Sequence, residues 1–130
     1  MSQNNQNKPE ISVLMSVYAE SADAITVAVE SILNQTFANF EFIIVNDNPT
    51  RADTRTLLDT LSEKDDRIQV LTNDRNRGLG YALNAAIQSS RADIVARMDT
   101  EDISFPERFA KQISFMKAHP NVHLLFTQWI

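Results

Sequence analysis

Apolar and polar positions follow two alternating rhythms along this chain. Short, almost uninterrupted apolar runs are typical of strands buried on both faces, and an apolar residue every three or four positions is typical of an amphipathic helix. The predicted strands span residues 11–17, 40–45, 68–71, 93–98 and 122–126. The predicted helices span residues 22–34, about 51–64, 79–87 and a last segment opened by Pro106. This alternation predicts an α/β fold with a mostly parallel, Rossmann-like sheet and flanking helices.

The third predicted helix has the clearest amphipathic pattern of the chain. Its apolar residues follow the i, i+3, i+4, i+7 and i+8 spacing of one helix face. They are Leu79, Ala82, Leu83, Ala86 and Ile87. The fourth predicted helix starts at Pro106 because proline is well tolerated in a first helical turn.

Length and charge narrow the function classes. The 130 residues fit one domain, and 43% hydrophobic with 22% charged residues is the profile of an ordinary globular protein. A net charge of −5 argues against nucleic acid or an anionic membrane surface as the main partner, since both favour a basic face. A small phosphorylated ligand stays compatible with this charge, because a bound metal can supply positive charge locally.

The sequence predicts neither a signal peptide nor a membrane-spanning helix. Residues 1–9 form a flexible polar tail, and residues 10–130 form the domain. No stretch approaches the ~20 apolar residues of a membrane helix, and no apolar run of signal-peptide length follows Met1. The chain has no cysteine, which excludes disulfides and thiolate metal sites and suits the cytoplasm.

Ligands of open parallel sheets bind outside the carboxyl ends of the strands, and this rule selects four loops. The loops are residues 16–19, 46–49, 73–80 and 99–102. They are rich in polar side chains, as a nucleotide diphosphate site requires. We expect all four loops to lie at the same edge of the sheet.

The loop after the fourth predicted strand carries the strongest chemical signal. Asp99, Glu101 and Asp102 place three carboxylates within four residues, and such charges repel one another unless a cation joins them. Mg²⁺ and Mn²⁺ prefer carboxylate and phosphate oxygens. An equally good alternative is a solvated acidic turn in which Asp102 or Ser104 caps the fourth helix.

Two further loops carry weaker signals. Asp47 can accept the N–H of a base with Tyr18 packed over the ring, although such a residue more often serves a turn or a cap. Gly78 and Gly80, the two glycines of the chain, permit close backbone approach to a ligand at a helix start. Arg77, or Arg75 beside it, can reach a phosphate. A plain turn explains these glycines nearly as well.

Several common sites are excluded by spacing. The Gly78-x-Gly80 pair lacks a third glycine and does not follow the first strand, so a dinucleotide fingerprint is not supported. Neither a Walker-type lysine loop nor a Gly-x-Ser-x-Gly elbow occurs. Pro120 lies between His119 and His123, and we interpret both histidines as surface or strand-end residues rather than zinc ligands. A phosphoacceptor receiver domain needs an acidic pair after strand one, where this chain has Ser16-Val17-Tyr18.

Taken in order, the motifs resemble family 2 glycosyltransferases with the GT-A fold. The resemblance covers residues 10 to about 127. Its segments are ISVLMSVY (11–18), ESILNQTF (30–37), FEFIIVND (40–47), NRG (76–78), ARMD (96–99) and the positions from Asp102 through Ser104, Pro106, Glu107 and Arg108 to Gln112. The first five of these segments, in the right order, are specific, whereas any one alone is weak.

The resemblance implies a donor site for a nucleotide-diphosphate sugar, with UDP favoured by Asp47 and Tyr18. The implied nucleotide-sugar-binding residues are Ser16, Tyr18, Asp47, Arg77, Gly78 and Asp99. The implied metal ligands, for Mn²⁺ or Mg²⁺, are Asp99 and Glu101. The chain departs from the family pattern at Ala19, at residues 46–49 and at Glu101, where the family usually has Asn, Asp-Asp-Gly-Ser and Asp.

The implied reaction is inverting transfer of a hexose to a glycan or lipid-linked acceptor, in bacterial polysaccharide biosynthesis. In the family the catalytic base and the acceptor site come from a region after the fifth strand, so we expect these 130 residues alone not to transfer sugar. We place the enzyme in the cytoplasm, at the inner face of the membrane, and expect self-association through the apolar side chains of residues 126–130. The alternative is a degenerate, non-catalytic nucleotide-binding or interaction module.

Overall fold

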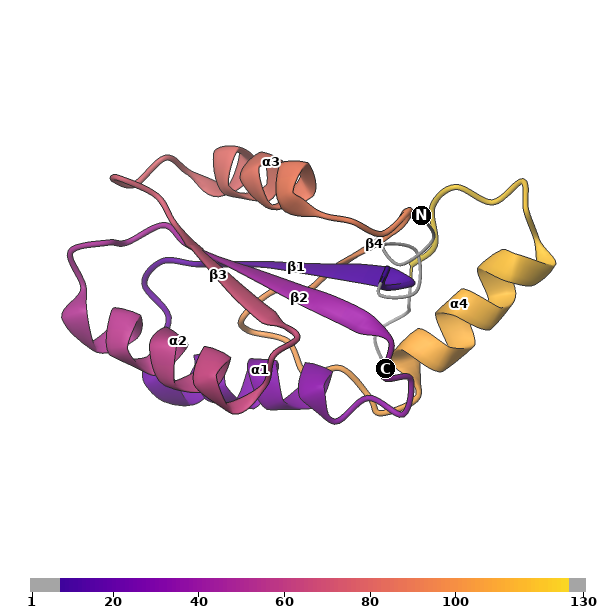
Figure 1. The fold of residues 1–130 in the computed structure, drawn as a ribbon, viewed down its shortest axis with the longest axis horizontal. Helices are drawn as coiled ribbons and strands as arrows, with labels where there is room; N and C mark the ends of the chain where they lie inside the picture. Colours follow the sequence, from indigo (N-terminus) through magenta and orange to yellow (C-terminus); the bar gives the residue numbers. More distant parts are fainter. Residues whose placement is uncertain (1–7, 127–130) are drawn as a thin grey trace, which may run out of the picture.

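The computed structural model describes residues 8–126, which form one parallel sheet between helices. The strands are β1 (Ile11–Val17), β2 (Phe40–Asn46), β3 (Ile68–Thr72) and β4 (Ile94–Arg97). The helices are α1 (Ala22–Leu33), α2 (Ala52–Lys64), α3 (Leu79–Ser89) and α4 (Arg108–Ala118). The strand order is β3-β2-β1-β4, and all three strand pairs are parallel (Figure 1), which confirms the predicted α/β fold.

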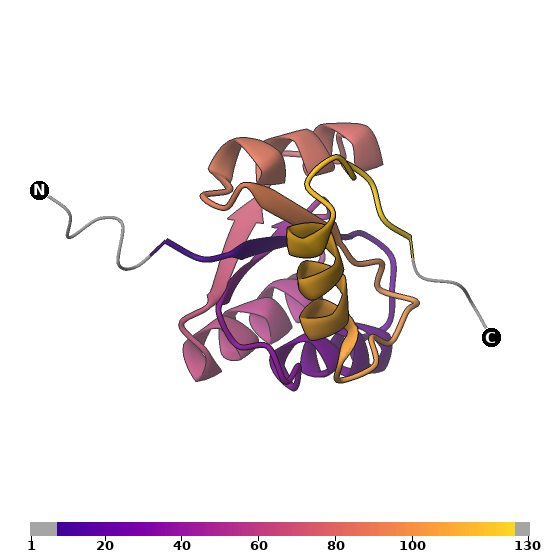
Figure 2. The ribbon, with the colours of Figure 1, turned by 90° about the vertical axis from the view of Figure 1, so that its right-hand side faces the viewer.

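The two faces of the sheet are covered unequally. Helices α1 and α2 lie on one face and α3 lies on the other, while α4 runs beside the sheet and packs Phe109 and Ile113 into the core of the first face (Figure 2). The first face carries the large core, in which the rings of Phe40 and Phe109 meet edge to face at 5.8 Å. The second face carries a smaller core, formed by Leu14, Ile43, Val45, Ala82 and Ala86. Because successive strand residues point to opposite faces, the odd-numbered residues of β2 face α3.

The clearest amphipathic pattern does form α3, but its apolar stripe is only partly buried. Ala82 and Ala86 are fully buried, whereas Leu79 and Ile87 are half exposed. Alanine removes little apolar surface from water, so the packing of α3 on the sheet contributes less than that of a leucine-rich helix.

The fifth predicted strand, residues 122–126, is absent. Val122 donates its amide to the carbonyl of His119 in a turn after α4, and residues 122–126 pair with no strand of the described sheet. An apolar run becomes a strand only when a neighbour satisfies its backbone groups. Within residues 8–126, β4 therefore remains an edge strand, and a groove of about 1060 Å³ lies between it and α4.

The fourth helix begins two residues later than predicted, at Arg108. Thr36 donates its backbone amide (2.9 Å) to the carbonyl of Pro106, so this carbonyl is engaged by the chain after α1. The N-cap residue is Glu107, and no side chain caps the helix, so the proposed caps Asp102 and Ser104 do not form. Phe109 and Ile113 are buried and form the inner face of this helix.

The amino-terminal tail was predicted as residues 1–9. Residues 1–7 lie outside the described residues, while Pro9 is buried and Lys8 forms an ion pair of 3.3 Å with Asp93. The predicted self-association edge lies mostly outside the described residues; its first side chain, Phe126, is largely exposed. Between residues 8 and 126, none of the helices has both the length and the apolar character needed to cross a membrane.

Candidate functional site

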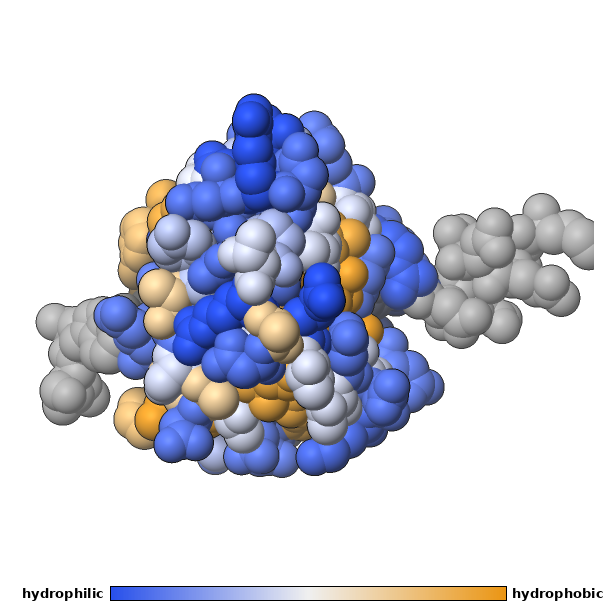
Figure 3. Space-filling model, turned by 90° about the vertical axis from the view of Figure 1, so that its left-hand side faces the viewer, coloured by the Kyte–Doolittle hydropathy of each residue, from blue (hydrophilic) through white to orange (hydrophobic). Residues whose placement is uncertain are grey.

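The four predicted loops meet at one edge of the sheet, where all strands end. Asp47 donates its amide to Val17 (2.9 Å), and Asn73 donates its amide to Asn46 (3.0 Å), so the loops after β1, β2 and β3 are joined. Figure 3 looks at this carboxyl edge, which lies on the left in Figure 1 and is mostly hydrophilic. We call it the carboxyl edge below.

Asp47 lies at the centre of the hydrogen bonds at this edge. Its Oδ1 accepts from Asn73 Nδ2 and from the backbone N–H of Arg77, both at 2.8 Å. Its Oδ2 accepts from the backbone N–H of Gly78 at 2.9 Å. Only 2% of Asp47 is exposed. The structure therefore brings three predicted site residues together, Asp47, Arg77 and Gly78.

The conformation of the loop before α3 depends on Gly78. Its φ of +90° is the one positive value among the described residues, and side chains with a Cβ rarely adopt it. With this backbone, the N–H of Gly78 points to Asp47 while its carbonyl accepts from Ala82 in the first turn of α3. Gly80, the second predicted glycine, lies within α3.

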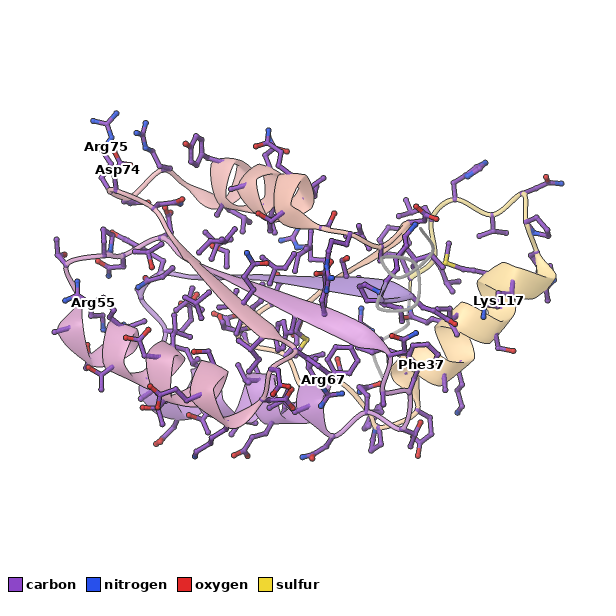
Figure 4. The ribbon with its side chains drawn as sticks, viewed as in Figure 1. Phe37, Arg55, Arg67, Asp74, Arg75 and Lys117 are labelled. Atoms are coloured by element: carbon purple, nitrogen blue, oxygen red, sulfur yellow. The ribbon has the colours of Figure 1, made fainter. Side chains whose placement is uncertain are left out.

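The arginine side chains of this loop differ in their partners. Arg77 forms an ion pair with Asp74 at 2.9 Å, which raises the pKa of Arg77 and lowers that of Asp74. The Arg77 guanidinium also lies 5.2 Å from the centre of the Tyr81 ring. Arg75 lies beside Asp74 at the tip of the loop and points outward (Figure 4). Arg75 is therefore the more available cation of the two.

The loop after β1 contributes Ser16 and Tyr18. Tyr18 is 44% exposed, so its ring is accessible for packing against a ligand. Its backbone is fixed on both sides: its N–H donates to Glu20 Oε2 (2.7 Å), and its carbonyl accepts from Asn48 Nδ2 (3.0 Å). Ser16 is partly buried and pairs in register with Val45, which places it on the α3 face of the sheet.

The acidic loop follows β4, on the other side of β1 from Asp47. Asp99 forms an ion pair of 3.2 Å with Arg97, Glu101 is exposed, and Thr100 between them is buried. The backbone of Asp102 closes a turn on the carbonyl of Asp99. Asp99 and Glu101 thus share one loop, and no hydrogen bond or ion pair within residues 8–126 links them to Asp47.

Arg108 anchors this acidic loop to α4. It donates to the carbonyl of Arg97 (3.1 Å) and to Ser104 Oγ (3.0 Å), which bracket the loop on both sides. Burial lowers the pKa of Arg108, and the nearby Asp102 carboxylate opposes this effect. Arg108 belonged to a motif of the resemblance, yet its anchoring role was not predicted, because the bonds join positions that only the fold brings together.

Asp99 and Glu101 are carboxylates of the kind that bind divalent metals, but two side chains alone are too few to complete a metal site. Among the described residues no cluster of three or more His, Cys, Asp or Glu side chains is assembled. Carboxylate oxygens match the preference of Mg²⁺ and Mn²⁺. The two residues fit a metal whose remaining ligands come from a bound diphosphate and water.

Two asparagines at the carboxyl edge were not predicted as site residues. Asn73 supplies one of the three hydrogen bonds of Asp47. Asn46 Oδ1 accepts from the N–H of Asn48 (3.0 Å), whereas its Nδ2 is buried without a partner. The histidines, as expected, are surface residues: both His119 and His123 are exposed.

Comparisons with known sequences identify the family. The sequence model of "Glycosyl transferase family 2" matches residues 12–128. An uncharacterized glycosyltransferase of Methanocaldococcus jannaschii is 37% identical over 124 residues, which cover 95% of this chain and 42% of the relative. The amylovoran biosynthesis glycosyltransferase of Erwinia amylovora is 38% identical over 114 residues, 87% of this chain and 42% of its own. The chain thus spans less than half the length of these curated relatives.

Solved structures agree on the fold. A mannosyltransferase from Pyrobaculum calidifontis, in complex with GDP-Man and Mn²⁺, matches with a TM-score of 0.78 at 22% identity, over 88% of this chain and 34% of that one. S. aureus TarS in complex with UDP-GlcNAc matches with a TM-score of 0.74 at 23% identity, over 85% of this chain and 32% of that one. With the family match over most of its length, this chain belongs to glycosyl transferase family 2.

Proposed function

We propose that this domain binds a nucleotide-diphosphate sugar, with a UDP-sugar favoured, at the carboxyl edge of its sheet, and that it serves inverting transfer to a glycan or lipid-linked acceptor. The proposal rests mainly on the loop before α3. The Asp47 carboxylate accepts hydrogen bonds from this loop and thereby holds it against the carboxyl ends of β2 and β3. Parallel sheets bind nucleotides at this edge.

The names of related proteins support the choice of ligand. A relative from Escherichia coli, 31% identical over 131 residues, is a UDP-Gal:alpha-D-GlcNAc-diphosphoundecaprenol beta-1,3-galactosyltransferase, and this chain covers 46% of it. Solved structures of similar fold contain UDP, UDP-GlcNAc, or GDP-Man with Mn²⁺. These ligands share a diphosphate and differ in base and sugar, so the diphosphate is the firmest part of the proposal.

Each residue has a distinct task in this site. Ser16, Tyr18 and Asp47 surround the base, with the exposed Tyr18 ring available for packing. Arg77 and Gly78, in the loop before α3, line one side of the nucleotide site. Arg75 at the tip of this loop adds positive charge that attracts a diphosphate. Asp99 and Glu101 hold Mn²⁺ or Mg²⁺ together with diphosphate oxygens.

A divalent metal bound there supplies a Lewis acid that neutralises charge on the departing diphosphate. The chain's own residues bind and orient the donor. A carboxylate from elsewhere in a longer enzyme deprotonates the acceptor hydroxyl. For this reason we expect that these 130 residues alone do not transfer sugar.

The decisive measurement is calorimetric titration of the protein with UDP, with and without Mn²⁺. We expect saturable binding that weakens roughly tenfold or more without Mn²⁺, a difference of about 1.4 kcal/mol. Binding that ignores the metal, or no binding, would favour the alternative of a non-catalytic module. The ion pair of Asp99 with Arg97 is the feature that favours this second function, because it occupies a carboxylate that a metal needs.

A further inference from the structure

Two segments that carry the family resemblance have no task at the proposed donor site. They are residues 30–37, at the end of α1, and the run from residue 102 to residue 112, which leads into α4. The fold brings these segments side by side, because the chain after β4 runs along α1 before it enters α4 (Figure 1). Since the second segment starts at the end of the acidic loop, its position also fixes one end of that loop.

The chain between the acidic loop and α4 is only weakly held by its own apolar side chains. Residues 102–105 belong to no helix or strand, and Ile103 is 65% exposed and Phe105 76% exposed. Exposed apolar side chains contribute little burial energy to the position of a backbone. Hydrogen bonds to the backbone of this segment therefore have the larger part in fixing its path.

The end of α1 supplies these hydrogen bonds. Ser104 donates its N–H to Ser31 Oγ at 3.1 Å. Thr36 donates both its N–H (2.9 Å) and its hydroxyl (3.2 Å) to the carbonyl of Pro106. The segment is thus attached to the end of α1 at two places.

Gln35 makes the central contact between the two segments. It is only 6% exposed, and its Nε2 donates to the carbonyls of Phe105 (2.7 Å) and Ser31 (3.1 Å), while its Oε1 accepts from the N–H of Phe109 (3.1 Å). Phe109 lies in the first turn of α4, where backbone N–H groups have no partner within their own helix. Gln35 thus caps α4 from α1, and its amide offers both the two donors and the acceptor that these partners need.

The proposed metal ligands depend on the backbone of their loop. Asp99 and Glu101 are both exposed, so neither carboxylate is fixed by packing. At one end the loop is held by β1, because Met98 donates its N–H to the carbonyl of Leu14 (2.9 Å). At the other end it passes into the segment that Gln35 holds. Mg²⁺ demands a nearly ideal ligand geometry, so the spacing of the two carboxylates controls metal affinity.

We propose that Gln35 is a positioning residue of the metal site: from the end of α1 it fixes the segment after the acidic loop, and thereby the spacing of Asp99 and Glu101. This inference rests on the proposed function. Gln35 is uncharged, so loss of its side chain changes the geometry of the loop and leaves the charge around the metal unchanged. Arg108 holds the same loop, but its own positive charge also acts on a bound cation. Gln35 therefore isolates the effect of position.

The test compares two alanine variants that each remove a buried, hydrogen-bonded side chain. Gln35→Ala removes the contact with the segment before α4. Ser12→Ala is the matched control, because the buried Ser12 hydroxyl bonds to Glu41 and to the N–H of Ala92, neither of which lies in that segment. Calorimetry gives the affinity for UDP with and without Mn²⁺, and backbone amide hydrogen exchange is measured in the free protein.

For Gln35→Ala we expect a loss of affinity that is confined to the metal. The gain in UDP affinity on adding Mn²⁺ should shrink by a factor of roughly three or more, while the affinity without Mn²⁺ stays within about twofold of wild type. Exchange should rise roughly tenfold at Phe109 and also increase at Asp102, whose N–H closes the turn of the acidic loop. In Ser12→Ala, faster exchange should appear at Ala92, with both affinities within about twofold of wild type.

Two outcomes overturn the inference. Equal losses of affinity with and without Mn²⁺ would show that Gln35 supports the fold as a whole. An unchanged Mn²⁺ effect would show that the acidic loop does not depend on Gln35.

Two further results keep the test decisive. Should Gln35→Ala fail to fold, Gln35→Met replaces it, since methionine adapts to the buried space without offering a donor, and the same selective loss is expected. A wild-type chain that binds no UDP overturns the proposed function, and exchange at Asp102 in the variant then decides whether Gln35 fixes the loop.

Discussion

Charged side chains at the two edges of the sheet differ in how many of them form ion pairs within the protein. At the amino edge, charges are paired: Glu41 with Arg91 and Asp65 with Arg67. Arg67 also donates to the carbonyls of Leu33 and Ala38 and lies over the Phe40 ring at 4.2 Å. Figure 4 shows Arg67 at this edge and Arg75 with Asp74 at the opposite one.

At the carboxyl edge, some charges are paired, as in Arg77 with Asp74 and Arg97 with Asp99, but two charged side chains are not. Within the described residues neither Asp47 nor Arg75 forms an ion pair, and Asp47 is held by neutral N–H groups alone. An arginine partner neutralises the negative charge of a carboxylate within the fold. A buried carboxylate without a cationic partner keeps its negative charge, which can act on a nearby ligand or metal ion. The comparison separates charges that stabilise the fold from charges available for binding.

The largest effect should come from removing the acidic loop's carboxylates. In the double variant Asp99→Ala, Glu101→Ala we expect the Mn²⁺-dependent part of UDP affinity to disappear, a loss of roughly tenfold or more. Thermal stability should change little, because surface substitutions are usually within about 0.5 kcal/mol. Calorimetry with and without Mn²⁺ measures the effect.

The control for this variant is Asp59→Ala, Glu63→Ala, which removes two exposed carboxylates from α2 and the same charge. If both double variants reduce the metal effect equally, overall charge rather than the loop is responsible, and the carboxyl edge loses its special status.

A moderate effect is expected from the amino edge, on stability only. Glu41→Ala leaves Ser12 Oγ and the N–H of Arg91 without their shared acceptor. The free energy of unfolding should fall by about 1.5–3 kcal/mol, the range for hydrogen bonds to an ionised group. Urea denaturation measures it. A drop in UDP affinity that exceeds the fraction unfolded would show that the two edges are not independent.

The smallest effect is a pH dependence that belongs to Glu41. Burial opposes its ionisation, but the hydrogen bonds from Ser12 and Arg91 outweigh burial and lower its pKa below the ordinary 4.5. A lowered native pKa stabilises the fold above the unfolded pKa, and this contribution is lost as the pH falls through the native pKa. The stability gap between wild type and Glu41→Gln should therefore be constant near neutral pH and shrink below about pH 4.5. A gap that stays unchanged down to pH 3 on urea denaturation would refute the assignment.

Much of the architecture was predictable because it depends on local patterns. Residues 40–46 are all buried, as the almost uninterrupted apolar run of residues 40–45 indicated. The loops after the strands lie at one edge because parallel strands end on the same side. Prediction failed for residues 122–126, whose apolar run lacks a partner strand, and at Pro106, whose carbonyl is taken by Thr36, 70 positions away.

By itself, the sequence determined the fold class, the family and the edge that carries the candidate site. The hydrophobic period is written into consecutive residues, and the family motifs are short segments. Only the tertiary structure decided that the Asp47 carboxylate accepts hydrogen bonds from residues 26, 30 and 31 positions away, in the loop before α3. It also decided that Glu41 accepts a hydrogen bond from the chain that leaves α3. Hydrogen-bond partners distant along the chain are chosen by how the helices and strands pack, so no local pattern specifies them.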